Sequence, residues 1–310
     1  MPRPIARSSG LIVDTKIRKY FVDDPDEISK LAVFTCNETV SHSQYRPINR
    51  YNTMKFQKLS VVIAILASFL IPQLNAVAGE RRFTFVYEST TAAQGEIEIE
   101  NWVTWKSKRG GGNTFDFRHE IEFGITDRFQ AAIYVVDWRV KDSQAGGADG
   151  AQAIYQDTAL ELIYNLTNPV TDIVGSAIYG EVKLGDQKFE LEGKVILQKN
   201  FGPLVVAYNA TFEAEWEGER FGYFNERKGK FEQSFGASWQ FTPNFLLGGE
   251  VLHEIEFENW SEVSDSLVYV GPNASFRYKS FFVTTTAMIQ ATALTGEPEF
   301  QLRTIFGYHF

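Results

Sequence analysis

Glutamates at every second position are the residues of this sequence with the most obvious chemical potential. They recur in the stretches 96–100, 120–122, 190–192 and 213–217. In an extended chain, side chains two residues apart point to the same side, so each stretch presents its carboxylates together. Paired carboxylates can serve in acid–base catalysis. Here they are too frequent for spacing alone to single out a catalytic pair, and they instead predict a shared acidic surface.

Histidines are the second group that could do chemistry, because a His beside a Ser can activate the hydroxyl for attack on an ester. His119 and His253 fall on the apolar faces of their segments, and His309 is the penultimate residue on a polar face. No local motif joins any of them to a nucleophile. A polar residue tolerated on an apolar face is the simpler interpretation. We therefore expect no enzyme, while a lipid-modifying hydrolase on an outer wall stays an alternative.

Composition excludes several classes of site and partner. Cys36 is the only cysteine, so neither an intramolecular disulfide nor a cysteine metal site can form. The net charge of −9 disfavours nucleic acid as a partner. The glycine-rich loops GGGN and AGGADGA are followed by no predicted helix, so they are not phosphate cradles. We expect neither a cofactor nor a metal.

An export signal is predicted over 54–78. Two lysines follow Met54, an uncharged stretch runs from Leu59 to Ile71, and Ala76–Val77–Ala78 fits a cleavage pattern. Cleavage is expected after Ala78. The preceding residues 1–53 are polar and aperiodic, and we interpret them as a mis-assigned, disordered upstream extension, with an unusually long leader as the alternative.

The rest of the chain is predicted to form β-strands. Alternating segments of similar length follow one another, separated by turn signals. They span 95–107, 113–125, 127–140, 152–165, 171–184, 187–199, 203–217, 228–241, 244–258, 265–278, 281–293 and 298–310. Connections after even-numbered segments are mostly tight, and those after odd-numbered ones are generally longer and more polar. This alternation, an apolar face on each segment and aromatic residues near segment ends are typical of outer-membrane barrels.

The predicted fold class is therefore all-β: a transmembrane, antiparallel, up-and-down β-barrel of about 12 strands over 95–310. A two-sheet sandwich is the alternative. The segment 79–94 lies outside the strand count. Its RRFTFVYES stretch also alternates, and it could be a thirteenth strand, a lead-in or a plug inside the lumen; the even count favours a lead-in or plug.

The last segment carries a recognisable ending. Phe306, Tyr308 and Phe310 share one face, with Leu302 and Phe300 before them. The exported chain with this ending resembles Gram-negative outer-membrane β-barrels, in which such a strand is read by the barrel-assembly machinery. The opening ERRFTFVYESTTAAQGEIEIENWVTW is similar to uncharacterised transport barrels related to the MetA-like phenol-degradation family. The resemblance implies an outer-membrane location, with lipid, lipopolysaccharide and the assembly machinery as partners.

Alternation also predicts the inner wall, where acidic side chains outnumber basic ones almost threefold. The lumen-lining candidates are Glu98, Glu100, Asp116, Arg118, Glu120, Glu122, Asp137, Arg139, Glu161, Glu181, Glu192, Lys194, Glu213, Glu215, Glu250, Glu254, Arg277 and Arg303. Such a wall predicts a wet pore that passes small solutes and favours cations or neutral molecules over anions. A lumen filled by salt bridges, as in a plugged structural or adhesive barrel, is the alternative.

Overall fold

The computed structural model describes residues 81–109, 112–141 and 151–310. The predicted upstream extension 1–53 and signal peptide 54–78 lie outside these residues, so both stay predictions. Among the described residues, no helix is long and apolar enough to cross a membrane.

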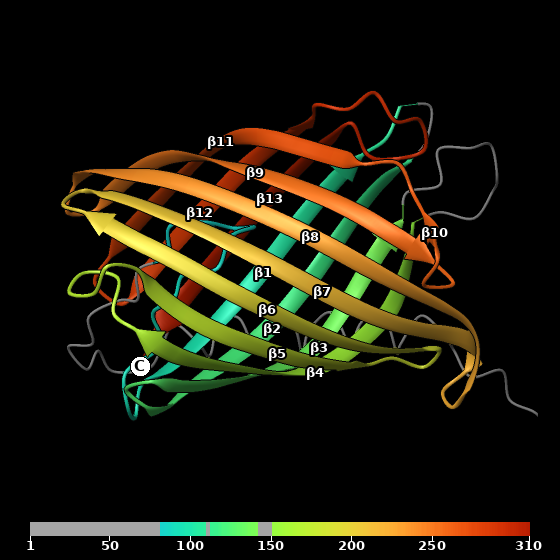
Figure 1. Cartoon of the computed structure of the whole chain (residues 1–310), viewed down its shortest axis with the longest axis horizontal. Helices are drawn as coiled ribbons and strands as arrows, with labels where there is room; N and C mark the ends of the chain where they lie inside the picture. Colours follow the sequence, from blue (N-terminus) through green and yellow to red (C-terminus); the bar gives the residue numbers. More distant parts are fainter. Residues whose placement is uncertain (1–80, 110–111, 142–150) are drawn as a thin grey trace, which may run out of the picture. The chain divides into compact units, whose positions relative to one another are not determined.

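Strands dominate the described chain and form one antiparallel sheet (Figure 1). In chain order the strands are β1 (Ile97–Ser107), β2 (Asn113–Thr126), β3 (Phe129–Lys141), β4 (Gln152–Thr167), β5 (Gly175–Leu184), β6 (Lys188–Phe201), β7 (Leu204–Arg220), β8 (Tyr223–Thr242), β9 (Phe245–Glu258), β10 (Glu262–Val263), β11 (Leu267–Tyr278), β12 (Phe281–Gln290) and β13 (Phe300–His309). Consecutive strands pair, except that β11 pairs with β9 instead of the short β10, and β13 returns to pair with β1. The sheet is therefore closed.

The predicted barrel of twelve strands is confirmed. Of the 13 strands described, β10 is a two-residue extension that pairs only with the end of β9, inside the loop before β11. The predicted bounds differ mainly at three places. The fifth strand begins at Gly175 because 168–174 form a turn, the eighth begins at Tyr223, and β12 ends at Gln290. Among the described residues, closure leaves none of the twelve long strands at an open edge.

The pattern of side-chain exposure follows the alternation of the sequence. In β6, Leu191 and Val195 are 40% and 47% exposed on the outer wall, whereas Glu190 and Lys194 are only 3% and 8% exposed inside. Water-soluble barrels have the opposite arrangement, with an apolar interior. A barrel that spans the hydrocarbon core of a membrane needs an apolar outer wall, and its interior can be polar, as it is here.

A bulge in β3 changes which residues face inward. Glu120 pairs with Tyr134, but its neighbour His119 pairs with Val136, so Val135 is an extra residue that lies on the outer wall. The inward positions therefore switch from even numbers, ending at Tyr134, to odd numbers, starting at Asp137. This switch brings Asp137 and Arg139 to the lumen wall.

Residues 81–94, called the inner segment below, lie inside the barrel and join no strand (Figure 1). Phe83 is fully buried and packs with Val205 and Ala207 on the inner face of β7. Gly236 on β8 leaves the space for its ring, since a Cβ there would come within 2.6 Å of Phe83. The alternating sequence of this stretch thus packs against the interior of the barrel instead of extending the sheet.

Candidate functional site

The lumen is the candidate site, and the inner segment divides it. Glu250 on β9 is the main anchor of this segment. Its carboxylate accepts hydrogen bonds from the backbone N–H groups of Thr84, Phe85 and Val86, at 2.9, 2.6 and 3.1 Å. Glu250 is 1% exposed. A buried carboxylate requires several donors, and here the backbone of the inner segment supplies three of them.

Amide side chains of the wall hold the rest of the inner segment by its backbone. Asn209 accepts from the Tyr87 N–H at 2.6 Å and donates to the Tyr87 carbonyl at 3.0 Å. Gln198 accepts from the Ser89 N–H at 2.7 Å, and Gln130 accepts from the Ala92 N–H at 2.8 Å. The wall therefore binds this peptide mainly through main-chain groups, spread over several strands.

Cations surround the aromatic side chains at the centre of the lumen. The Trp102 ring lies 4.6, 5.1 and 5.5 Å from the guanidinium carbons of Arg81, Arg118 and Arg303. Arg303 also lies 3.9 Å from the Phe85 ring. Such contacts stabilise a desolvated cation against an aromatic face. Through Arg81 and Phe85, these contacts attach the inner segment to the wall in addition to the hydrogen bonds.

Two adjoining cavities of about 370 Å³ each lie between the inner segment and the long loops, and we call them the loop-side cavities. They share Lys106, Arg118, Lys183 and Glu213 among their lining residues. Of the described residues, the first cavity is lined by eight basic and seven acidic side chains: Lys106, Arg118, Arg139, Lys183, Lys188, Lys228, Lys230, Arg303, Asp116, Asp137, Asp157, Glu190, Glu213, Glu215 and Glu256. Its wall is thus nearly balanced in charge.

Lysines neutralise the carboxylates of the loop-side cavities. Lys183 lies 2.7 Å from Glu190, 3.3 Å from Glu181 and 3.4 Å from Glu192. Lys230 contacts Glu213 at 2.7 Å. Close pairing of this kind removes much of the cost of enclosing so many charges.

The third cavity, of about 130 Å³, lies on the opposite side of the inner segment, towards the short turns, and we call it the turn-side cavity. Its described lining has five glutamates, Glu88, Glu96, Glu98, Glu100 and Glu122, against Arg81 and His309. Burial lowers the pKa of Arg81, but Glu100 and other nearby groups outweigh that effect and raise the pKa well above its usual range. Arg81 therefore stays charged. Negative charge is concentrated on this side of the lumen.

The structure brings most predicted lumen residues to these cavities. Residues lining the loop-side cavities are Asp116, Arg118, Asp137, Arg139, Glu181, Glu192, Lys194, Glu213, Glu215, Glu254 and Arg303. Glu98, Glu100 and Glu122 line the turn-side cavity. Glu250 and Glu161 contact the inner segment directly. Glu120 is buried beside Glu122, and Arg277 lies at the short-turn rim, where its Nε donates to the Pro243 carbonyl at 2.9 Å.

Three lysines of the loop-side wall were missed from the sequence. Lys188, Lys228 and Lys230 all line the first cavity. Each lies within two residues of an end of its predicted segment. The same alternation, continued one step from Glu190 to Lys188 and two steps from Glu232 to Lys228, identifies all three and lowers the excess of acid on the loop side.

The histidines differ in their surroundings. His309 is buried, and its Nε2 lies 2.9 Å from Glu98. His119 forms hydrogen bonds with Asn101 and Trp138. His253 lies between Gln233, at 3.3 Å, and the Ser266 hydroxyl. The Ser266 hydroxyl beside His253 is a possible nucleophile.

The final strand closes the barrel. All of β13 pairs with β1 on one side and β12 on the other. The rings of Tyr308 and Phe310 meet edge to face at 4.9 Å, and Phe306 is 38% exposed on the outer wall. The role of these residues as an assembly signal stays a prediction.

Comparison with known protein families gives a match over most of the chain. The sequence profile of a family of unknown function (DUF6662) matches residues 75–302. The chain belongs to this family. No curated protein matches the DUF6662 chain in sequence. The finer similarity to barrels related to the MetA-like family stays a prediction.

Solved structures of outer-membrane proteins are similar to this DUF6662 barrel. The COG4313 outer membrane channel from Pseudomonas putida F1 aligns with a TM-score of 0.51 at 13% identity, over 72% of this chain and 98% of that one. A NanC porin aligns with a TM-score of 0.46 at 7% identity, over 69% and 98%. At these identities the similarity concerns the fold alone.

Proposed function

We propose that the protein is an outer-membrane channel that passes small solutes through the barrel lumen. The proposal rests on the two adjoining loop-side cavities, which are lined by paired charges and enclosed by an apolar outer wall. Charged walls of this kind bind water and small polar solutes and reject apolar ones. The inner segment narrows the path towards the short turns.

Selectivity is set by the turn-side cavity. A permeating ion meets an almost balanced wall on the loop side and an excess of carboxylates below the inner segment. Enclosed negative charge raises the local concentration of cations and lowers that of anions. We propose a preference for cations and neutral polar solutes, with its origin in the acidic part of the lumen.

The proposed channel function also implies a cellular location and binding partners. A signal cleaved after Ala78 would export the chain, and the assembly machinery would bind the β13 strand that ends at Phe310. The exposed apolar wall would contact outer-membrane lipid, with lipopolysaccharide at the long loops. In this orientation the turn-side cavity faces the periplasm.

Planar-bilayer recording of the purified barrel tests the channel proposal. We expect discrete current steps from wild-type protein and larger steps from a variant lacking residues 81–94. Current from the deletion variant alone would indicate that the inner segment blocks the resting path. Absence of current from both proteins would refute the proposal and favour a plugged structural or adhesive barrel.

A second candidate is hydrolysis of lipid esters at the outer wall, favoured by the contact between His253 and Ser266. In this mechanism the Ser266 hydroxyl attacks the ester carbonyl and His253 takes its proton and passes it to the departing alcohol; water then hydrolyses the acyl-serine and releases the fatty acid. The Gln233 amide nitrogen lies 3.3 Å from Nδ1 of His253. Its amide group would have to rotate so that its oxygen accepts from Nδ1–H, which leaves Nε2 free to take the Ser266 proton. Fatty-acid release from phospholipid vesicles tests it: release must disappear in Ser266→Ala. Equal release from both proteins, or none from wild type, excludes this function.

A further inference from the structure

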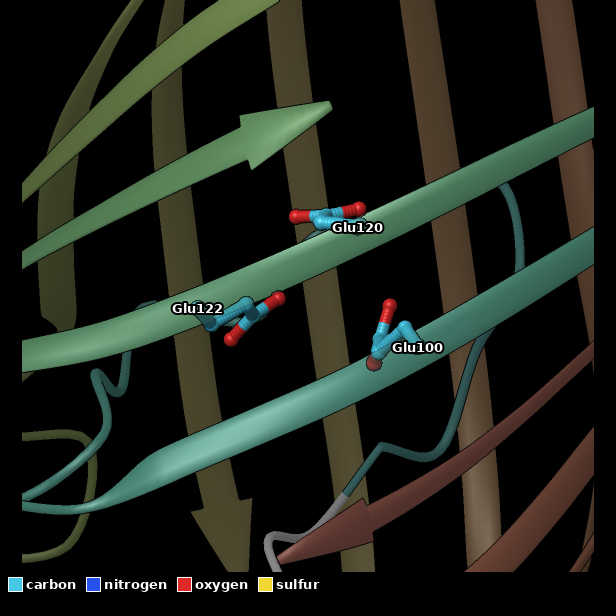
Figure 2. A group of neighbouring side chains, drawn as sticks. All are labelled: Glu100, Glu120 and Glu122. Atoms are coloured by element: carbon cyan, nitrogen blue, oxygen red, sulfur yellow. The ribbon is translucent and has the colours of Figure 1, made fainter. Parts of the chain in front are cut away.

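Three buried glutamates face one another beneath the inner segment (Figure 2). Glu100 comes from β1, and Glu120 and Glu122 come from β2; they are 1%, 1% and 5% exposed. One carboxylate oxygen from each lies within 4.8 Å of the others. The three residues are called the turn-side triad below.

The strand register forces these charges together. Glu100 pairs directly with Glu120, and Glu98 pairs directly with Glu122. Like charges directly opposite on neighbouring strands destabilise a sheet. The protein therefore needs an opposing charge at this place.

The protein supplies only part of that opposing charge. Arg81 lies 3.3 Å from Glu100 and 3.7 Å from Glu122. The remaining oxygens of these two residues accept hydrogen bonds from Trp102 and Gln130, both at 2.7 Å. By contrast, neither carboxylate oxygen of the buried Glu120 has a hydrogen-bond partner among the described residues. A buried carboxylate without a donor is costly.

A second triad in the same barrel shows the difference. Glu190, Glu192 and Glu213 have a similar separation of their oxygens. Lys183 and Lys188 contact Glu190, Lys194 contacts Glu192, and Lys230 contacts Glu213, all within 3.0 Å. Lysines therefore balance the second triad, whereas a single arginine serves the turn-side triad among the described residues.

We propose that the turn-side triad binds a hard divalent cation, such as Ca²⁺, between Glu120 and the two glutamates that contact Arg81. Three carboxylates and one guanidinium leave two negative charges, which one divalent ion balances. Three carboxylate oxygens that lie within 4.8 Å of one another are at most about 2.8 Å from a common centre, so small side-chain movements bring them to the usual calcium–oxygen distance of about 2.4 Å. The turn-side cavity, which Glu100 and Glu122 line, provides the route of entry.

Terbium luminescence of the purified, folded barrel tests this site. The Trp102 indole donates to Glu100, so it lies close enough to the ion to sensitise bound Tb³⁺. We expect a saturable, tryptophan-excited signal that excess Ca²⁺ displaces. Glu120→Gln should weaken Tb³⁺ affinity by about tenfold or more, because ligand charge sets the affinity of such sites. The matched variant Glu213→Gln, in the second triad, should bind as wild type does.

Thermal unfolding gives an independent measurement. Excess Ca²⁺, compared with EDTA, should raise the unfolding midpoint of wild type and Glu213→Gln but not that of Glu120→Gln. In EDTA, Glu120→Gln should be at least as stable as wild type, because it removes an unbalanced buried charge. If Glu120→Gln fails to fold, the wild-type titration with Trp102→Phe as the optical control decides.

Two results would overturn the proposal. One is the absence of a saturable signal and of calcium stabilisation in wild type, which would mean that a proton satisfies Glu120. The other is an equal response of Glu120→Gln and Glu213→Gln, which would place the ion elsewhere. Neither readout depends on channel activity, so failure here leaves the proposed transport function untouched.

Discussion

Replacing Glu250 by alanine should release the inner segment from the wall. Glu250 accepts three backbone N–H groups of this segment, at distances between 2.6 and 3.1 Å. A hydrogen bond to a charged group contributes roughly 1.5–3 kcal/mol, so three give about 4.5–9 kcal/mol. The lower end applies in a wet lumen, because freed amides bind water. A loss of about 4 kcal/mol shifts the ratio of docked to released segment about a thousandfold.

Two assays measure this release. Hydrogen exchange of the amides of Thr84, Phe85 and Val86 should accelerate in Glu250→Ala, and bilayer recordings should show larger or longer current steps. Glu254→Ala is the matched control, because Glu254 lies on the same face of β9 and lines the loop-side cavities. Unchanged exchange and unchanged current in Glu250→Ala would refute the assignment of Glu250 as the anchor.

Three further variants probe the packing, the charges and the end of the chain. Gly236→Ala should displace Phe83 and speed exchange of the inner segment, whereas Gly193→Ala, with nothing within 4 Å of its Cβ, should not; equal effects would contradict the packing argument. Lys183→Gln leaves three glutamates without their shared cation. We expect a stronger cation preference in bilayers and a loss of roughly 1–3 kcal/mol in unfolding free energy. A shift of the selectivity towards anions would count against this prediction. Deleting Phe310 should lower the amount of folded barrel in the membrane while export continues, and normal membrane levels would argue against an assembly signal.

The barrel could be predicted from the sequence because alternation is a local property. Leu191 and Val195 against Glu190 and Lys194 already distinguish two faces, and the long chain of such segments implies closure. The bulge at Val135 could not be predicted, since one extra residue leaves the composition of the strand unchanged.

The arrangement of the candidate site could not be predicted from local sequence patterns, because it depends on contacts between residues that are distant in the chain. The inner segment alternates as a strand does, and only tertiary contacts such as those of Glu250 place it inside the lumen. The turn-side triad depends on the register that sets Glu100 opposite Glu120. Register comes from pairing between strands, so no single segment reveals it.

Cation selectivity is best tested by the reversal potential of a membrane that contains the wild-type barrel, measured under a salt gradient. We expect a potential whose sign indicates cation preference, because of the carboxylates of the turn-side cavity. A potential of the opposite sign, or a membrane that carries no current even after deletion of residues 81–94, would contradict it.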